Sequence, residues 1–142
     1  MKPTRKRLVD RSQAPSYYAV ARAFRTSAEA LAELAGQSDT YGNAIALLAI
    51  HAAIGYADTL AVAFGGQKST DDHARAPDLL QGVLKAQMPA EMVKTLRAVI
   101  GAKDEVSSQG AYYPLEDGRR LLAKAARFCV WADDLYQRRP PA

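Results

Sequence analysis

The sequence is poor in the residues that build several common kinds of site. A single cysteine, Cys129, excludes an internal disulfide and favours a reducing, cytoplasmic setting. The only two histidines are His51 and His73. Glycine-rich phosphate loops, C-x-x-C pairs and G-x-S-x-G elbows are missing. We therefore expect no metal, no cofactor and no catalytic thiol, with Cys129 as a small core residue.

Length and charge indicate one domain with basic ends. The chain has 142 residues, of which 49% are hydrophobic and 24% charged, and its net charge is +4. We expect a basic flexible tail over 1–14, a single domain over 15–138 and a short tail over 139–142. The basic start lacks an apolar stretch behind it, so we expect no secretory signal. The mild positive charge permits a nucleic-acid partner without requiring one.

The periodicity predicts an all-α, up-and-down bundle of four to five helices. Apolar stripes with helical spacing run over about 15–36, 76–84, 89–106 and 121–137. Gly101 interrupts the third of these, and we favour continuation to Val106 over an end at Ile100. No window alternates as strands do. The segment 44–64 is almost wholly apolar, and its polar interruptions favour a buried core helix over a membrane span.

His51 and Asp58 interrupt this apolar helix seven residues apart. Two helical turns separate them, so they lie on nearly the same face, with Gly55 between them. Helical metal ligands are usually three or four residues apart, which argues against a metal site. We expect satisfied core residues, or else residues of a pocket or a subunit interface.

Three basic residues repeat along the last predicted helix and are candidate phosphate contacts: Arg120, Lys124 and Arg127. The alternative is an ordinary solvated face, because Glu116 precedes Arg120 by four residues and suits a surface ion pair. His73 follows Asp71 and Asp72 in a polar loop, and we expect it to start a helix in solvent.

Four segments together resemble the HEPN family, named for higher eukaryotes and prokaryotes nucleotide-binding. They are LLAIHAAIGYADTLAVAFGG, STDDHARAPDLLQGVL, LRAVIGAKDEVSSQGAYY and LLAKAARFCVWADDLY, within residues 16–137. The resemblance implies a helical bundle, a homodimer, and a role in RNA metabolism. It also implies a partner, a nucleotidyltransferase or an antitoxin, as in toxin–antitoxin and defence systems.

Active members of that family cut RNA without a metal, using an arginine, a polar residue and a histidine four to six positions after the arginine. Here Lys103 and Asp104 stand at the start of this motif, and Ser107, Ser108 and Gln109 stand where the histidine would be. Serine cannot transfer protons near neutral pH as histidine does. The family-site position is marked by five residues: Lys103, Asp104, Ser107, Tyr112 and Tyr113. The two tyrosines either stack on bases or staple the loop to the bundle.

The sequence therefore predicts a non-catalytic bundle that binds RNA, a nucleotide or a partner protein. One alternative is a metal-independent ribonuclease with a displaced catalytic set, in which His51 or His73 lies near Lys103. A second alternative is a structural or assembly protein without a nucleic-acid role.

Overall fold

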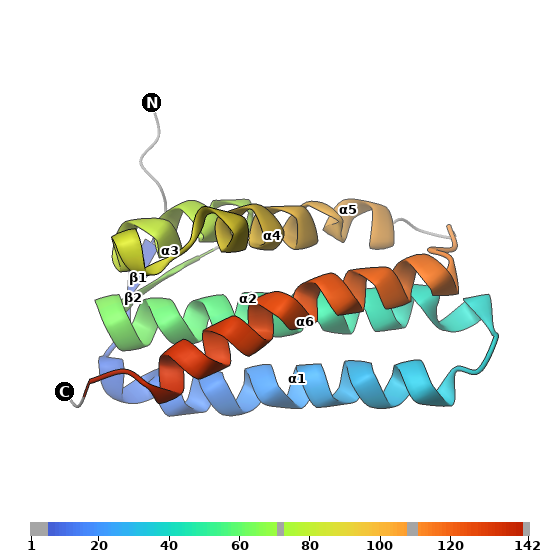
Figure 1. The fold of residues 1–142 in the computed structure, drawn as a ribbon, viewed down its shortest axis with the longest axis horizontal. Coiled ribbons are helices and arrows are strands. Elements are labelled where there is room, and N and C mark those ends of the chain that lie inside the picture. Colours follow the sequence, from blue (N-terminus) through green and yellow to red (C-terminus); the bar gives the residue numbers. More distant parts are fainter. Residues whose placement is uncertain (1–5, 71–72, 108–110, 141–142) are drawn as a thin grey trace.

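The structure, a computed structural model, describes residues 6–70, 73–107 and 111–140. It is an all-α helical bundle, as the periodicity predicts (Figure 1). The long helices are α1 (Ala14–Leu34), α2 (Gly42–Gly65), α4 (Ala90–Gly101) and α6 (Leu115–Gln137). Shorter helices are α3 (Ala76–Leu84) and α5 (Lys103–Val106), with 3-10 turns η1 (Arg11–Gln13), η2 (Asp39–Tyr41), η3 (His73–Arg75) and η4 (Lys85–Gln87).

Helix α2 is the centre of the bundle because it is apolar on nearly every side. It packs against α1 and α6 over most of its length, and α3, α4 and α5 lie along its remaining side (Figure 1). Its fully buried side chains include Ile45, Ile50, Tyr56 and Leu60. The segment Asp39–Gly65 is long and apolar enough to cross a membrane by composition, but most of its apolar window is buried inside the bundle. This burial is typical of a core helix.

Two glycines of α2 allow the neighbouring backbone to come close. A Cβ atom on Gly55 would lie 2.8 Å from the Cβ of Ala21, so α1 and α2 touch at this crossing. A Cβ atom on Gly42 would lie 1.8 Å from the carbonyl oxygen of Tyr113. At the other end of α2, Gly66 takes the left-handed conformation that ends many helices (φ 63°). The helix therefore stops at the pair Gly65 and Gly66.

The chain start differs from the expected flexible tail over 1–14. Within that range, Lys6–Leu8 form strand β1, which pairs antiparallel with strand β2 (Gln67–Ser69), and η1 follows. Arg7 also donates a hydrogen bond to the Tyr17 hydroxyl (3.3 Å). Strands of three residues are too short for the alternation that reveals strands in a sequence.

The predicted helix over 89–106 is broken in two. Helix α4 ends at Gly101, and α5 starts at Lys103 after a break at Ala102. Helical structure therefore reaches Val106, as we favoured, but the expectation of one unbroken helix is wrong. The break at this point sets the position of Lys103 and Asp104 relative to the rest of α4.

Candidate functional sites

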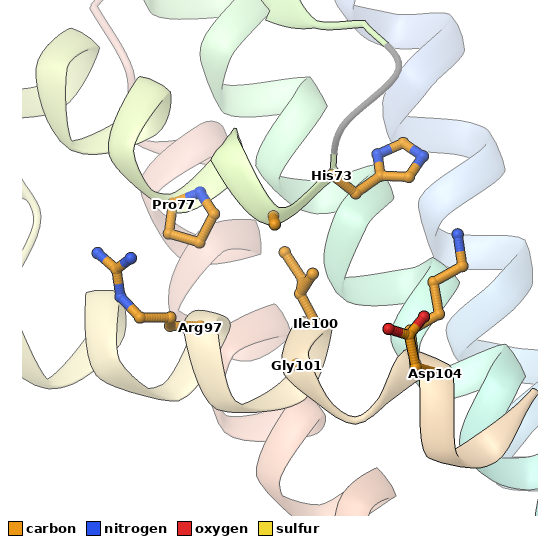
Figure 2. Close-up of a pocket in the computed structure, with 8 residues that line it drawn as sticks. His73, Pro77, Arg97, Ile100, Gly101 and Asp104 are labelled. Atoms are coloured by element: carbon orange, nitrogen blue, oxygen red, sulfur yellow. The ribbon is translucent and has the colours of Figure 1, made fainter. Parts of the chain in front are cut away.

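One cleft gathers charged residues from two parts of the fold. Its volume is about 450 Å³, and it lies between the η3–α3 segment and the α4–α5 segment. Figure 2 shows His73 and Pro77 on one side and Arg97, Ile100 and Asp104 on the other. The remaining lining residues are Ala74, Gly101 and Lys103. We call this site the charged cleft.

The charges of the cleft are partly balanced. Arg97 donates to the Asp78 carboxylate at 2.8 Å, and both side chains are about half exposed. Lys103 is half-buried, and its positive charge acts on His51 of α2. The pKa of His51 is lowered mainly by burial and further by this charge. Both cations therefore act on another helix, Arg97 on Asp78 of α3 and Lys103 on His51 of α2.

Two of the five residues at the family-site position line the cleft. They are Lys103 and Asp104, whereas Ser107 lies exposed beyond α5. Ser108 and Gln109 lie outside the described residues. Tyr112 is 74% exposed, so its side chain does not staple the loop to the bundle.

The loop at Tyr113 is held to α2 by Asn43. The Asn43 Oδ1 atom accepts from the Tyr113 N–H at 2.9 Å, and its Nδ2 atom donates to the carbonyl oxygens of Val106 (2.8 Å) and Ala111 (3.1 Å). Tyr113 itself is half-buried. One asparagine thus joins both ends of the segment between α5 and α6.

Sequence reasoning named His73 as a residue that a displaced catalytic set would use, but it missed Arg97. His73 does line the same cleft as Lys103 and Asp104. Arg97 stands seven residues before Asp104, as His51 stands before Asp58, but the break at Ala102 lies between Arg97 and Asp104. The sequence therefore carried no reliable signal for Arg97.

His51 and Asp58 line one cavity on the other side of the bundle. This cavity has a volume of about 370 Å³ and lies between α1 and α2, with Gly55 also in its wall. The pair predicted from its seven-residue spacing therefore shares a cavity. His51 stacks on Phe24, with ring centroids 5.3 Å apart.

Asp58 is a buried carboxylate with a lysine beside it. It is 7% exposed, and the Lys68 Nζ atom lies 3.5 Å from its Oδ2 atom. Burial raises the pKa of Asp58 to about 6, although Lys68 and Arg7 act to lower it. Lys68 also lies over the Tyr17 ring, 5.1 Å from its centroid, so it connects β2 to both α1 and α2.

A polar network between α1, α2 and α6 is not visible in the sequence. The Tyr56 hydroxyl donates to the Asp133 carboxylate at 2.7 Å, and the Tyr18 hydroxyl donates to it at 3.0 Å. Gln137 donates to both Asp133 and the Tyr18 hydroxyl. Burial and the Asp133 carboxylate raise the pKa of Tyr56. This network satisfies polar groups between three helices and needs no ligand.

The remaining predicted residues have ordinary surroundings. Arg120 pairs with both Glu116 (2.6 Å) and Asp117 (3.1 Å), which is the surface ion pair weighed as the alternative. Lys124 and Arg127 are exposed on α6. Cys129 is buried, and burial raises the pKa of its thiol to about 12. The thiol is therefore inert near neutral pH.

No group of three or more His, Cys, Asp or Glu residues is placed to hold a metal ion within residues 6–70, 73–107 and 111–140. Comparison of the chain with family models, curated proteins and solved structures finds no significant match.

Proposed function

We propose that this protein binds RNA, or a nucleotide, through phosphate contacts in the charged cleft, and that it does not cleave what it binds. The observation that supports the proposal is the gathering of Arg97, Lys103 and His73 in one cleft of about 450 Å³. That volume falls within the range of about 300–1,000 Å³ typical of ligand sites. Pro77 and Ile100 provide an apolar floor beside the charges.

Lys103 is the residue on which the proposal depends most. Arg97 already pairs with Asp78, whereas the structure gives Lys103 no carboxylate within ion-pair distance among the described residues. A lysine acts on phosphate as a compact point charge on a flexible stem. Binding through phosphates releases counterions and so weakens as salt rises.

The test is binding of a fluorescent single-stranded RNA across a salt series. We expect Lys103→Gln to weaken binding and to reduce the slope of log affinity against log salt by about 1, the effect of losing one phosphate contact. Lys94→Gln is the matched control, because Lys94 is exposed on the neighbouring helix α4 and does not line the cleft. Equal losses in the two variants would contradict the placement of the site. Absence of affinity even at low salt would favour the structural or assembly role.

One observation favours a second candidate, the metal-independent ribonuclease. His73 shares the cleft with Lys103 and Asp104, and histidine is the side chain whose ordinary pKa suits proton transfer near neutral pH. The test is incubation with RNA in the presence of a chelator. Cleavage that disappears in His73→Ala and persists in His51→Ala would establish this candidate. No cleavage by the unmodified protein would exclude it.

Assembly belongs to the same proposal. The HEPN resemblance implies a homodimer and a nucleotidyltransferase or antitoxin partner, in a toxin–antitoxin or defence system of the cytoplasm. Sedimentation equilibrium of the purified protein measures whether it forms a homodimer. A monomer at all concentrations would argue against the homodimer.

A further inference from the structure

The cavity between α1 and α2 has the composition of a site for a small ligand. Its wall is mostly apolar or aromatic, from Tyr17, Val20, Phe24 and Ile54. Its polar side chains include His51 and Asp58, which stand two helical turns apart on α2. An apolar cavity with a few placed polar groups is typical of small-molecule sites.

The backbone beside the cavity is held in place by the crossing of α1 and α2. At Gly55 the two helices touch, since a Cβ atom there would lie 2.8 Å from Ala21. The cavity opens next to this contact, and Val20, at 55% exposure, stands at its rim. The site is therefore formed mainly by two long, packed helices, with Gln13 of η1 also in its wall.

Burial of the Asp58 carboxylate costs more folding free energy than an apolar side chain at this position would. The Lys68 ammonium lies 3.5 Å from the Asp58 Oδ2 atom, and this distance is longer than the roughly 2.7–2.9 Å of a strong charged hydrogen bond. A buried carboxylate with so few donors destabilises the protein. Such a group at the wall of a cavity is typical of a functional site.

The surroundings of Asp58 select the kind of ligand. Lys68 and Arg7 lie close enough to act on the carboxylate, and they would repel an organic cation. The carboxylate itself, together with the apolar wall, disfavours an anion. The ligand that fits is uncharged, flat enough to lie against Tyr17 and Phe24, and able to donate hydrogen bonds to a carboxylate.

Among the nucleobases, guanine alone presents two adjacent donors, N1–H and N2–H, to such a carboxylate. Adenine, cytosine and uracil each place an acceptor beside their donor, which would face a carboxylate oxygen. We propose that the cavity between α1 and α2 binds a guanine base, with Asp58 accepting from N1–H and N2–H. This site is separate from the charged cleft, and it requires no phosphate.

The test is a titration of the ¹⁵N-labelled protein with guanosine at pH 7.5. We expect the backbone amide signals of Val20, Ile54 and Gly55 to shift. Inosine lacks the N2 amino group and 1-methylguanosine lacks N1–H, and each should bind about 10-fold more weakly or worse. Hexaribonucleotides with one guanine or one inosine in a uridine background show whether a base within RNA enters as well as a free nucleoside.

Variants separate the roles of the residues. Asp58→Asn replaces one acceptor by a donor, so it should lose guanosine and gain xanthosine, which presents an acceptor beside N1–H. The matched control is Asp134→Asn, since Asp134 is an exposed partner of Arg138 on α6. Val20→Trp, at the rim, should block the cavity without changing a buried residue.

Three results would each overturn the proposal. They are equal affinities for guanosine and inosine, unchanged guanosine binding by Asp58→Asn, and no shift of the three amides up to the solubility of guanosine. Guanosine carries no phosphate, so none of these results bears on RNA binding at the charged cleft. In the same way, a failure to bind RNA at the charged cleft would not change how the guanosine titration is read.

Discussion

Replacing Asp58 by asparagine should make the protein more stable near neutral pH and should remove one part of its pH dependence. The folded state raises the pKa of this carboxyl from its ordinary 3.8 to about 6, chiefly through burial. The folded protein therefore binds the proton more tightly than the unfolded chain does. The contribution of Asp58 to stability is fully present below about pH 4 and is lost as the pH rises through about 6.

The magnitude follows from the same two values. A pKa difference of one corresponds to about 1.4 kcal/mol, so the whole change corresponds to about 3 kcal/mol. Between pH 4.5 and 7.5 the linkage relation gives a loss of about 2 kcal/mol. Asparagine does not titrate, so the stability of the unmodified protein relative to Asp58→Asn should fall by about this amount over that range.

Urea unfolding followed by circular dichroism measures this difference at each pH. Asp134→Asn is the control and should show no comparable change, because Asp134 is exposed. A stability difference between the unmodified protein and Asp58→Asn that is constant with pH would refute the reasoning. A change of the opposite sign would mean that the Lys68 ion pair outweighs burial.

Four further predictions concern stability and reactivity. Gly42→Ala should cost about 3 kcal/mol or more because its Cβ would lie 1.8 Å from a backbone oxygen. Gly82→Ala in α3 should raise the free energy of unfolding by about 1 kcal/mol, because the added Cβ meets nothing within 4 Å. Urea unfolding measures the effect of both glycine variants. Tyr56→Phe removes the 2.7 Å hydrogen bond to Asp133 and should lower the free energy of unfolding by at least about 1.5 kcal/mol. A smaller loss would mean that this network contributes little to stability. Cys129 should resist iodoacetamide at pH 8 until urea unfolds the protein, as mass spectrometry would show.

Helical periodicity was enough to predict most of the fold. Ala21 and Ala28 are buried on α1, and Ala35 is buried directly after its end. Helix α3 begins at Ala76, where Pro77 is favourable. The break at Ala102 was harder to predict, because the apolar stripe continues across it to Val106. The pairing of β1 with β2 depends on residues about sixty positions apart, and nothing in either three-residue strand indicates the other.

The candidate sites were predictable where they depend on a single helix. His51 and Asp58 share a cavity because seven residues make two turns. The charged cleft depends on two segments, since His73 comes from η3 and Lys103 from α5. Their proximity is a tertiary effect, so the sequence could offer it only as one alternative.

The most direct test of the proposed function is to locate bound RNA on the protein by NMR. A single-stranded RNA is added to the ¹⁵N-labelled protein at low salt, and the backbone amide shifts are mapped. If RNA binds in the charged cleft, we expect the largest amide shifts at Ala74, Ile100 and Gly101, which line it. Shifts confined to the exposed face of α6 around Lys124 and Arg127 would contradict this site.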